Sequence, residues 1–394
     1  MRRRGIFGRV FSASNVRWSE VDWHVLFVAL MLLGTGLTFL WAMDAAEGES
    51  MRLAGGVNFA GHRQKVLVTL PLILAGMFVR PSWLRAYAGW IYTACLMLLV
   101  AVMFIGDERN NARRWIQLPA FDLQPSELAK VGLVLMLARL LASNRLQEPK
   151  DWIAPLAAAG VPIVLVAGQP DLGTAMTMVP VTLGMLYLAG ARARSILGLV
   201  ACGAVLAFGA RQAGMVQEYQ WKRVETWAAT YEPEGLLALK TGSGYHLYQA
   251  RTAIGNGGAW GRGLGQGVAN GAGHLPERDS DSVFAVIAEE AGFYGAAGLL
   301  IVYSLLVILI MLSASALRDR FSRLVVGGVA IYFAAHVFIN VSTNIGLLPM
   351  TGLTLPLISA GGSSLLATFL ALGLALGLGS HHDTRLDSDA FQSY

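Results

Sequence analysis

The sequence predicts an all-α integral membrane protein with about ten transmembrane helices and one large extracytoplasmic loop before the eighth. Hydrophobic residues make up 55% of the 394 residues and charged residues only 14%, whereas a soluble chain has roughly 25% charged residues. The mean hydropathy is +0.53, and the apolar residues gather in runs close to the length that crosses a bilayer, about 17 residues or more. We therefore expect residues 1–394 to form a single polytopic membrane domain.

Ten apolar runs define the predicted spans, and several of these runs are short or rich in glycine. The fourth run begins just after Pro125, a residue that suits the first turn of a helix, and the eighth begins just after an acidic stretch. The predicted spans cover residues 25–43, 65–79, 84–105, 126–141, 153–168, 172–190, 195–210, 283–313, 324–345 and 361–379.

The basic residues predict the orientation of the chain. Cytoplasmic segments of membrane proteins carry an excess of lysine and arginine, and ten spans place a basic tail (residues 1–24) and a second tail (residues 380–394) on that same side. Every predicted inner loop holds at least two basic residues: Arg80, Arg85, Arg145, Lys150, Arg192, Arg194, Arg318, Arg320 and Arg323. Both termini are therefore expected to be cytoplasmic, and topology explains the net charge of +5 without a nucleic-acid partner.

The outer face is predicted to carry one long loop, residues 211–282, and loops of this length tend to be functional. Residues 217–231 are rich in aromatic and charged side chains and are expected to form an interfacial helix. Residues 255–273 are dense in glycine, which favours tight turns near the lipid head groups.

Five carboxylates surround the start of the eighth span: Glu277, Asp279, Asp281, Glu289 and Glu290. Ionisable groups are costly at bilayer depth and usually mark a path for a substrate or ion. The alternative is a solvated helix start, where acidic residues suit the helix dipole. This alternative accounts for Asp279 and Asp281, but poorly for Glu289 and Glu290, which lie about two turns further along.

A second charged group opens the fourth span. Glu127 and Lys130 are three residues apart on a helix and can pair, and a purely structural ion pair is an equally good interpretation. Arg113 and Arg114 precede them on the same side of the membrane, and arginine favours bidentate contact with phosphate oxygens. The group therefore suits a phosphate-bearing ligand.

Three further segments have polar residues near a predicted span. Asp171 in Gln169-Pro-Asp171 is expected to serve a turn rather than catalysis, and Asn340 and Asn344, on one helix face, are expected to form interhelical hydrogen bonds. Residues 352–364 contain proline and paired glycine, which predict a broken or re-entrant backbone that must be buried in protein. Physical chemistry alone indicates an enzyme or transporter of an anionic amphiphile.

At these residues the sequence resembles the SEDS family, the RodA/FtsW peptidoglycan glycosyltransferases of bacteria, over nearly the whole chain. The matching motifs are Arg113-Arg-Trp115, Gln124-Pro-Ser-Glu-Leu-Ala-Lys130, Gln169-Pro-Asp-Leu-Gly173, Gly242-Ser-Gly-Tyr245, Leu275-Pro-Glu277, Phe284-Ala-Val286 with Glu289-Glu290, and Gly352-Leu-Thr-Leu-Pro356 with Gly361-Gly-Ser363. The resemblance implies polymerisation of lipid II at the outer face of the bacterial cytoplasmic membrane, with a class B penicillin-binding protein as partner. Motifs of both branches occur, with a slight lean toward the division (FtsW-like) type.

The resemblance also implies the site. Asp281 aligns with the essential aspartate of the family and is expected to act as general base, taking the proton from the acceptor sugar 4-hydroxyl during an inverting transfer. Arg113, Arg114 and Lys130 are positively charged and are predicted to lie on the outer side of the membrane. We therefore expect them to offset the negative charge on the departing pyrophosphate. The residues expected to bind substrate are Arg113, Arg114, Lys130, Glu127, Ser126, Glu277 and Glu289.

Two departures from the family pattern lie close to this site. Asp279-Ser-Asp-Ser282 replaces the usual His-Thr-Asp-Phe, and Ala360 stands where tyrosine is common. An extra acid at Asp279 is expected to raise the pKa of Asp281 by repulsion, or to help hold a divalent cation, or to be neutral. No cofactor is otherwise implied.

Two other functions compete with the polymerase. A lipid II flippase would use the same cations but would need charges near the midplane that are reachable from both sides, whereas these charges crowd the outer face. A catalytically silent scaffold of a cell-wall synthesis complex is the third interpretation, because the sequence around Asp281 is unusual.

Overall fold

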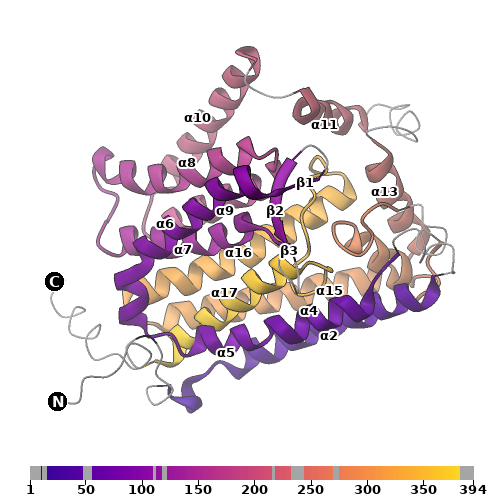
Figure 1. Cartoon of the computed structure of the whole chain (residues 1–394), viewed down its shortest axis with the longest axis horizontal. Coiled ribbons are helices and arrows are strands. Elements are labelled where there is room, and N and C mark those ends of the chain that lie inside the picture. Colours follow the sequence, from indigo (N-terminus) through magenta and orange to yellow (C-terminus); the bar gives the residue numbers. More distant parts are fainter. Residues whose placement is uncertain are drawn as a thin grey trace.

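The protein is a bundle of helices with one small sheet (Figure 1). The computed structural model describes residues 10, 16–47, 56–109, 112–117, 122–214, 218–231, 244–268 and 275–381. The elements are η2 (Trp18–Glu20), α2 (Trp23–Ala46), α4 (Phe59–Thr69), α5 (Pro71–Met77), α6 (Pro81–Ile105), β1 (Asp107–Arg109), β2 (Ala112–Gln117), β3 (Asp122–Leu123), α7 (Pro125–Ala142), η3 (Pro149–Trp152), α8 (Ile153–Gly168), α9 (Leu172–Leu188), α10 (Ala193–Gln212), α11 (Glu218–Ala229), α13 (Tyr245–Gly257), α15 (Val283–Ala316), α16 (Arg320–Ile345) and α17 (Gly362–Ser380).

The all-helical membrane fold is confirmed, and each of the ten predicted spans coincides with a helix or a pair of helices. Within the described residues, seven helices are long and apolar enough to cross a membrane: α2, α6, η3 with α8, α10, α15, α16 and α17. The other three fall short for local reasons. Pro71 breaks the second span into α4 and α5, α7 carries three charged residues, and α9 has only 17 residues.

The helices α7, α16 and α17 form the centre of the bundle, because most of their residues are buried. Small residues let neighbouring helices approach closely. A Cβ on Gly373 would lie 2.3 Å from the carbonyl oxygen of Ile73, so α17 and α5 meet backbone to backbone. By contrast α10 has no buried residue and packs only lightly against α9, and it projects from the bundle in Figure 1.

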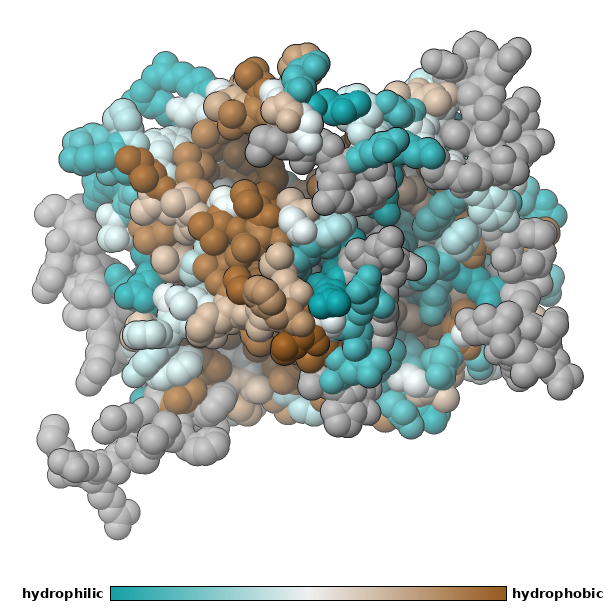
Figure 2. Space-filling view, turned by 45° about the horizontal axis from the view of Figure 1, so that its top comes forward, coloured by the Kyte–Doolittle hydropathy of each residue, from teal (hydrophilic) through white to brown (hydrophobic). Residues whose placement is uncertain are grey.

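The predicted inner segments lie together at one end of the bundle. Arg320 donates from Nη2 to the carbonyl oxygens of Asn144 (2.9 Å) and Ala189 (3.0 Å), which joins three of these segments. Val16 and His381 pair through an isolated β-bridge at the same end. We call this the basic end. The space-filling view shows an apolar band between hydrophilic residues on both sides (Figure 2).

The opposite end, called the site end here, carries α11, α13 and the antiparallel sheet β1-β2-β3 (Figure 1). The predicted interfacial helix is α11, whereas α13 and the sheet were not expected. The first three residues of the glycine-dense segment, 255–257, belong to the helix α13. Residues 215–217, 232–243 and 269–274 of the predicted outer loop, and most of both tails, lie outside the described residues.

The predicted break before the last span is present. Residues 351–361 contain no helix, and Leu355, Leu357 and Ile358 are buried in protein, as the absence of water requires. The hydroxyl of Tyr303 in α15 donates to the carbonyl oxygen of Pro356. The Ala360 amide donates to the Asp279 carbonyl oxygen at 2.7 Å, so this segment forms a fixed wall beside the loop that precedes α15.

Candidate functional site

The loop before α15 is held by its backbone from two sides. Asn340 and Asn344 of α16 donate from Nδ2 to the carbonyl oxygen of Asp281, at 3.1 and 3.0 Å. On the other side Ser359 Oγ donates to the carbonyl oxygen of Ser280 at 2.6 Å. The asparagines thus bind a loop carbonyl rather than another helix, which corrects the expected interhelical role. The loop is positioned without using the side chain of Asp281.

The carboxylate of Asp281 is half-buried and has no hydrogen bond or ion pair within the part of the chain that the structure describes. Gly352, with a φ of 71°, faces it, and a Cβ there would lie 3.3 Å from Asp281 Oδ2. Glycine therefore keeps the space beside the carboxylate open. A partly buried carboxylate on a fixed backbone, with its oxygens unused, can accept a proton from a ligand.

The surroundings of Asp281 favour its protonated form. Burial contributes most, and the charges of Glu277, Asp279 and Asp171 add to it, so that the pKa of Asp281 rises to about 7, while Arg223 acts in the opposite direction. The charge of Asp279 thus acts in the direction that the sequence predicts, toward a higher pKa of Asp281. A pKa near neutrality suits a general base at physiological pH.

Ser282 is buried and contacts His246 of α13, with Nε2 and Oγ 2.5 Å apart. Burial, with a smaller effect of Arg223, lowers the pKa of His246 to about 4, although a hydrogen bond with the Pro276 backbone acts against this. Proline offers only its carbonyl oxygen, so the neutral ring donates there and accepts from Ser282. This link fixes the residue next to Asp281, and no spacing in the sequence indicated it.

Asp171 joins two motifs that are far apart in the sequence. It caps α9 by accepting from the Thr174 amide at 3.2 Å, and it accepts from Gln124 Nε2 at 2.8 Å and Ser126 Oγ at 3.4 Å. The expected turn role is therefore present, and Ser126 is a buried partner of that turn. The charge of Asp171 also reaches Asp281.

The two arginines of the strand β2, Arg113 and Arg114, differ in the contacts that their side chains form. Arg114 donates from Nε to the Gln169 carbonyl oxygen at 2.7 Å and from Nη2 to that of Pro170. Arg113 is exposed and forms an ion pair with exposed Glu108 at 3.2 Å. Arg113 is thus the more available of the two for an anionic ligand, because exposed ion pairs are weak.

Lys130 lies inside the bundle with only 1% of its surface exposed. Its Nζ is 2.7 Å from Glu127 Oε1 and 2.8 Å from His336 Nε2, and it lies over the Tyr332 ring. The expected pairing of Glu127 with Lys130 is therefore present. Both groups are enclosed, so contact between Lys130 and a ligand requires a rearrangement of α7 and α16.

The remaining acids of the opening stretch separate into two kinds. Glu277 is exposed and accepts from Ser280 Oγ at 3.0 Å. Glu289 and Glu290 are buried and hold the glycine-rich segment after α13: Glu289 accepts from Asn256 Nδ2 at 3.2 Å, and Glu290 accepts from the Gly265 amide at 3.0 Å.

Close contact between Gly261 and Gly292 completes this attachment. Both have positive φ, and a Cβ on Gly292 would lie 2.2 Å from the Gly261 nitrogen. The helix α15 departs from helical geometry at Gly292. Residues 257–267 and the first turns of α15 therefore form one unit.

A metal site is not indicated by the described residues, since they contain no group of three or more histidine, cysteine, aspartate or glutamate side chains that could hold an ion. The described part of the site contains the unused carboxylate of Asp281 and the exposed Arg113.

The fold and the site together define a polytopic helical membrane protein with, at one end, a carboxylate that no described residue pairs with. Residues 23–384 match the family model of FtsW, RodA and SpoVE, described as cell cycle proteins, and the chain belongs to this family, the SEDS family.

Several relatives show the extent of the match. The chain is 36% identical over 369 residues to the probable peptidoglycan glycosyltransferase FtsW of Mycobacterium tuberculosis, covering 91% of this chain and 67% of that one. It is 31% identical over 369 residues to the peptidoglycan glycosyltransferase MrdB of Escherichia coli K12, covering 92% and 95%. The similar identities leave the lean toward the division branch only weakly supported.

Two solved structures share the fold. The rod shape determining protein RodA of Thermus thermophilus has 28% sequence identity and a TM-score of 0.68, with 93% of this chain and 99% of that chain covered. A structure of the coordination of polymerization and crosslinking by a peptidoglycan synthase complex contains a chain with 28% identity and a TM-score of 0.77, with 95% and 100% covered.

Proposed function

We propose that this chain, a peptidoglycan glycosyltransferase of the SEDS family, polymerises lipid II at the outer face of the cytoplasmic membrane with Asp281 as general base. The observation that carries the proposal is the carboxylate of Asp281, which has no partner among the described residues although its backbone is fixed. Its pKa of about 7 leaves a large fraction of the carboxylate ready to accept a proton at neutral pH.

The proposed reaction uses this carboxylate as its base. Asp281 takes the proton of the acceptor sugar 4-hydroxyl while that oxygen attacks the anomeric carbon of the donor. The new glycosidic bond forms as the bond from the anomeric carbon to the pyrophosphate oxygen breaks, and the polyprenyl pyrophosphate leaves with the bonding electrons. Attack from the side opposite the leaving group inverts the anomeric centre.

The charge on the leaving pyrophosphate needs a cation. Arg113 is the best-placed of the expected residues, because it is exposed and held only by an exposed glutamate. Arg114 contributes charge from its position on the Gln169-Pro170 turn. Exposed Glu277, four residues before Asp281, is assigned to the acceptor sugar. Ser126, Glu127, Lys130 and Glu289 are buried and act by positioning the segments that carry these groups.

The proposed topology places the basic end in the cytoplasm and the site end outside, because positive charge is retained inside. A class B penicillin-binding protein is the proposed partner. Support comes from the likeness to a chain of a peptidoglycan synthase complex that couples polymerization and crosslinking.

The test is a polymerisation assay with purified protein, its transpeptidase partner and labelled lipid II, resolved on a gel. Wild type is expected to make glycan strands, Asp281→Asn none, and Glu225→Gln, which removes an exposed carboxylate on α11, as many as wild type. Strands from Asp281→Asn at the wild-type rate would reject the general base. Transport of lipid II across a vesicle membrane, with no glycan strands formed, would instead favour the flippase.

A further inference from the structure

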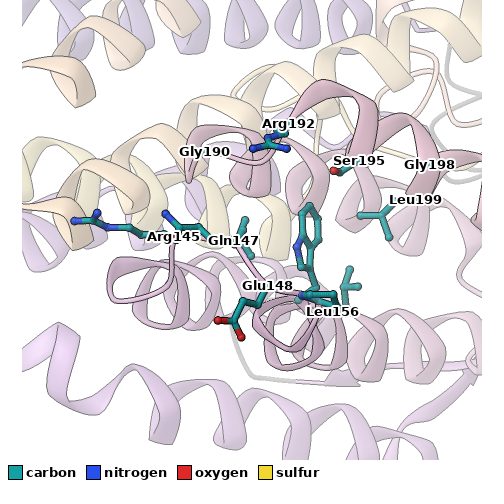
Figure 3. Close-up of a pocket in the computed structure, with 12 residues that line it drawn as sticks. Arg145, Gln147, Glu148, Leu156, Gly190, Arg192, Ser195, Gly198 and Leu199 are labelled. Atoms are coloured by element: carbon teal, nitrogen blue, oxygen red, sulfur yellow. The ribbon is translucent and has the colours of Figure 1, made fainter.

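A pocket of about 850 Å³ lies at the basic end, far along the bundle from Asp281. Its walls come from the loop between α7 and η3, from the start of α8 and from the start of α10. Figure 3 shows Arg192 and Leu199 on the α10 side, with Glu148 and Leu156 on the other. The volume is in the range of pockets that bind drug-sized ligands, about 300–1,000 Å³.

Arginine gives this pocket a positive charge. Arg145 and Arg192 both line it, both are exposed, and neither forms an ion pair or side-chain hydrogen bond within the described residues. The one carboxylate of the lining, Glu148, is paired with Lys150 at 2.7 Å. Two free guanidinium groups on separate loops favour a ligand with phosphate oxygens.

The wall that carries Arg145 is preformed. Asn144 accepts from the Leu146 amide at 2.8 Å and donates to the Asp151 carbonyl oxygen at 2.6 Å, and Arg320 fixes the Asn144 carbonyl. Leu146 has a φ of 53° and is buried. Such a conformation persists only where the surroundings hold it, so a ligand does not have to order this loop.

Part of the wall between α8 and α10 is apolar. Leu156 of α8 and Leu199 of α10 line the pocket, and α10 stands apart from the bundle without a buried residue. A positively charged rim above an apolar gap between transmembrane helices matches a phospholipid, whose phosphate lies above its acyl chains. Basic pockets of this kind between helices bind anionic lipid head groups.

We propose that this pocket binds an anionic membrane phospholipid, with its phosphate between Arg145 and Arg192 and an acyl chain along Leu156 and Leu199. In the proposed topology this lipid belongs to the cytoplasmic leaflet. The site is separate from the site of glycan transfer, and its occupancy does not depend on the proposed reaction.

The test measures binding of dioleoyl phosphatidylglycerol to the purified full-length protein in detergent by native mass spectrometry. Each arginine near a membrane surface contributes about fivefold in affinity for an anionic lipid, so the Arg145→Gln/Arg192→Gln variant is expected to bind about 30-fold more weakly. The matched control is Arg194→Gln/Arg318→Gln, which removes the same charge from exposed positions at the same end without touching the lining. This control is expected to bind like wild type.

A second pair of variants tests the apolar part without changing charge. Gly198 lines the pocket and has open space at its Cβ, so Gly198→Leu fills the gap, while Gly203→Leu on the same helix does not line it and also meets open space. Loss of binding in Gly198→Leu alone is expected, and both variants should fold because leucine favours a helix over glycine.

Three outcomes would overturn the proposal. These are equal losses in the two arginine double variants, equal binding of phosphatidylcholine and phosphatidylglycerol by wild type, and displacement of the lipid by an equal concentration of glycerol 3-phosphate. The last would assign the pocket to a soluble phosphate compound.

Discussion

The loop around Asp281 and the first turns of α15 are adjacent in sequence and both carry carboxylates, yet the structure uses these carboxylates in opposite ways. Glu289 and Glu290 are buried and bonded to the segment after α13. Asp281 has neighbours that hold only its backbone. The comparison teaches that a structural carboxylate is recognised by its hydrogen-bond partners and its burial, and a reactive one by oxygens that remain unused on a fixed backbone.

The largest effect is expected at the reactive carboxylate. Asp281→Asn keeps the shape of the side chain but cannot accept the proton, and loss of a general base reduces the rate by about 10²–10⁴-fold. Turnover of labelled lipid II at pH 7.5 measures this.

The same variant should not lose stability. The folded-state pKa of Asp281 is about 7, above the unfolded value of about 3.9, so the folded state binds more protons between these values and stability falls as pH rises through the interval. Asp281→Asn is therefore expected to unfold at a higher temperature than wild type above pH 7. A lower unfolding temperature there would assign Asp281 a structural role.

The next largest effect is expected where a buried charge loses its partner. Lys130→Met leaves Glu127 and His336 enclosed without the ammonium group, and breaking a buried ion pair costs about 3–5 kcal/mol. Denaturant unfolding in detergent measures the change. The Lys130→Met/Glu127→Gln variant serves as control and should recover part of the loss, whereas no recovery would contradict a paired role.

A smaller loss is expected at a structural acid of α15. Glu290→Gln removes the charged acceptor of the Gly265 amide, and a hydrogen bond to a charged group contributes about 1.5–3 kcal/mol. The melting temperature should fall while turnover per folded molecule stays near that of wild type. If turnover instead collapsed with the melting temperature unchanged, Glu290 would join Asp281 on the reactive side of the comparison.

The smallest effect tests how Asp279 acts on Asp281. Asp279→Asn removes a negative charge that raises the pKa of Asp281, so the rise of activity with pH should move to lower pH. Activity at pH 7 can then increase by at most about twofold, because close to half of the base is already unprotonated there. A pH–rate profile measures the shift, and a profile that moved to higher pH would contradict repulsion between the two acids.

Much of the fold could be predicted because apolar runs and basic loops are visible in short, continuous segments of the sequence. The pairing of Glu127 with Lys130 has a local spacing and was also predictable. The bonds of Asn340 to the Asp281 loop, of Ser126 to Asp171 and of His246 to Ser282 join residues that are far apart in sequence. No periodicity encodes such contacts, and for the same reason the enclosure of Lys130 could not be foreseen.

The bridge between Val16 and His381 has a consequence for how often the chain crosses the membrane. The Arg17 amide also donates to the Ser380 carbonyl oxygen at 3.0 Å. The segment before α2 and the end of α17 therefore meet on one side of the membrane. A chain that begins and ends on one side must cross an even number of times. Seven helices of the described residues qualify by length and composition, which is an odd number. The pair α4–α5, with α7 and α9, supplies three further crossings and brings the total to ten.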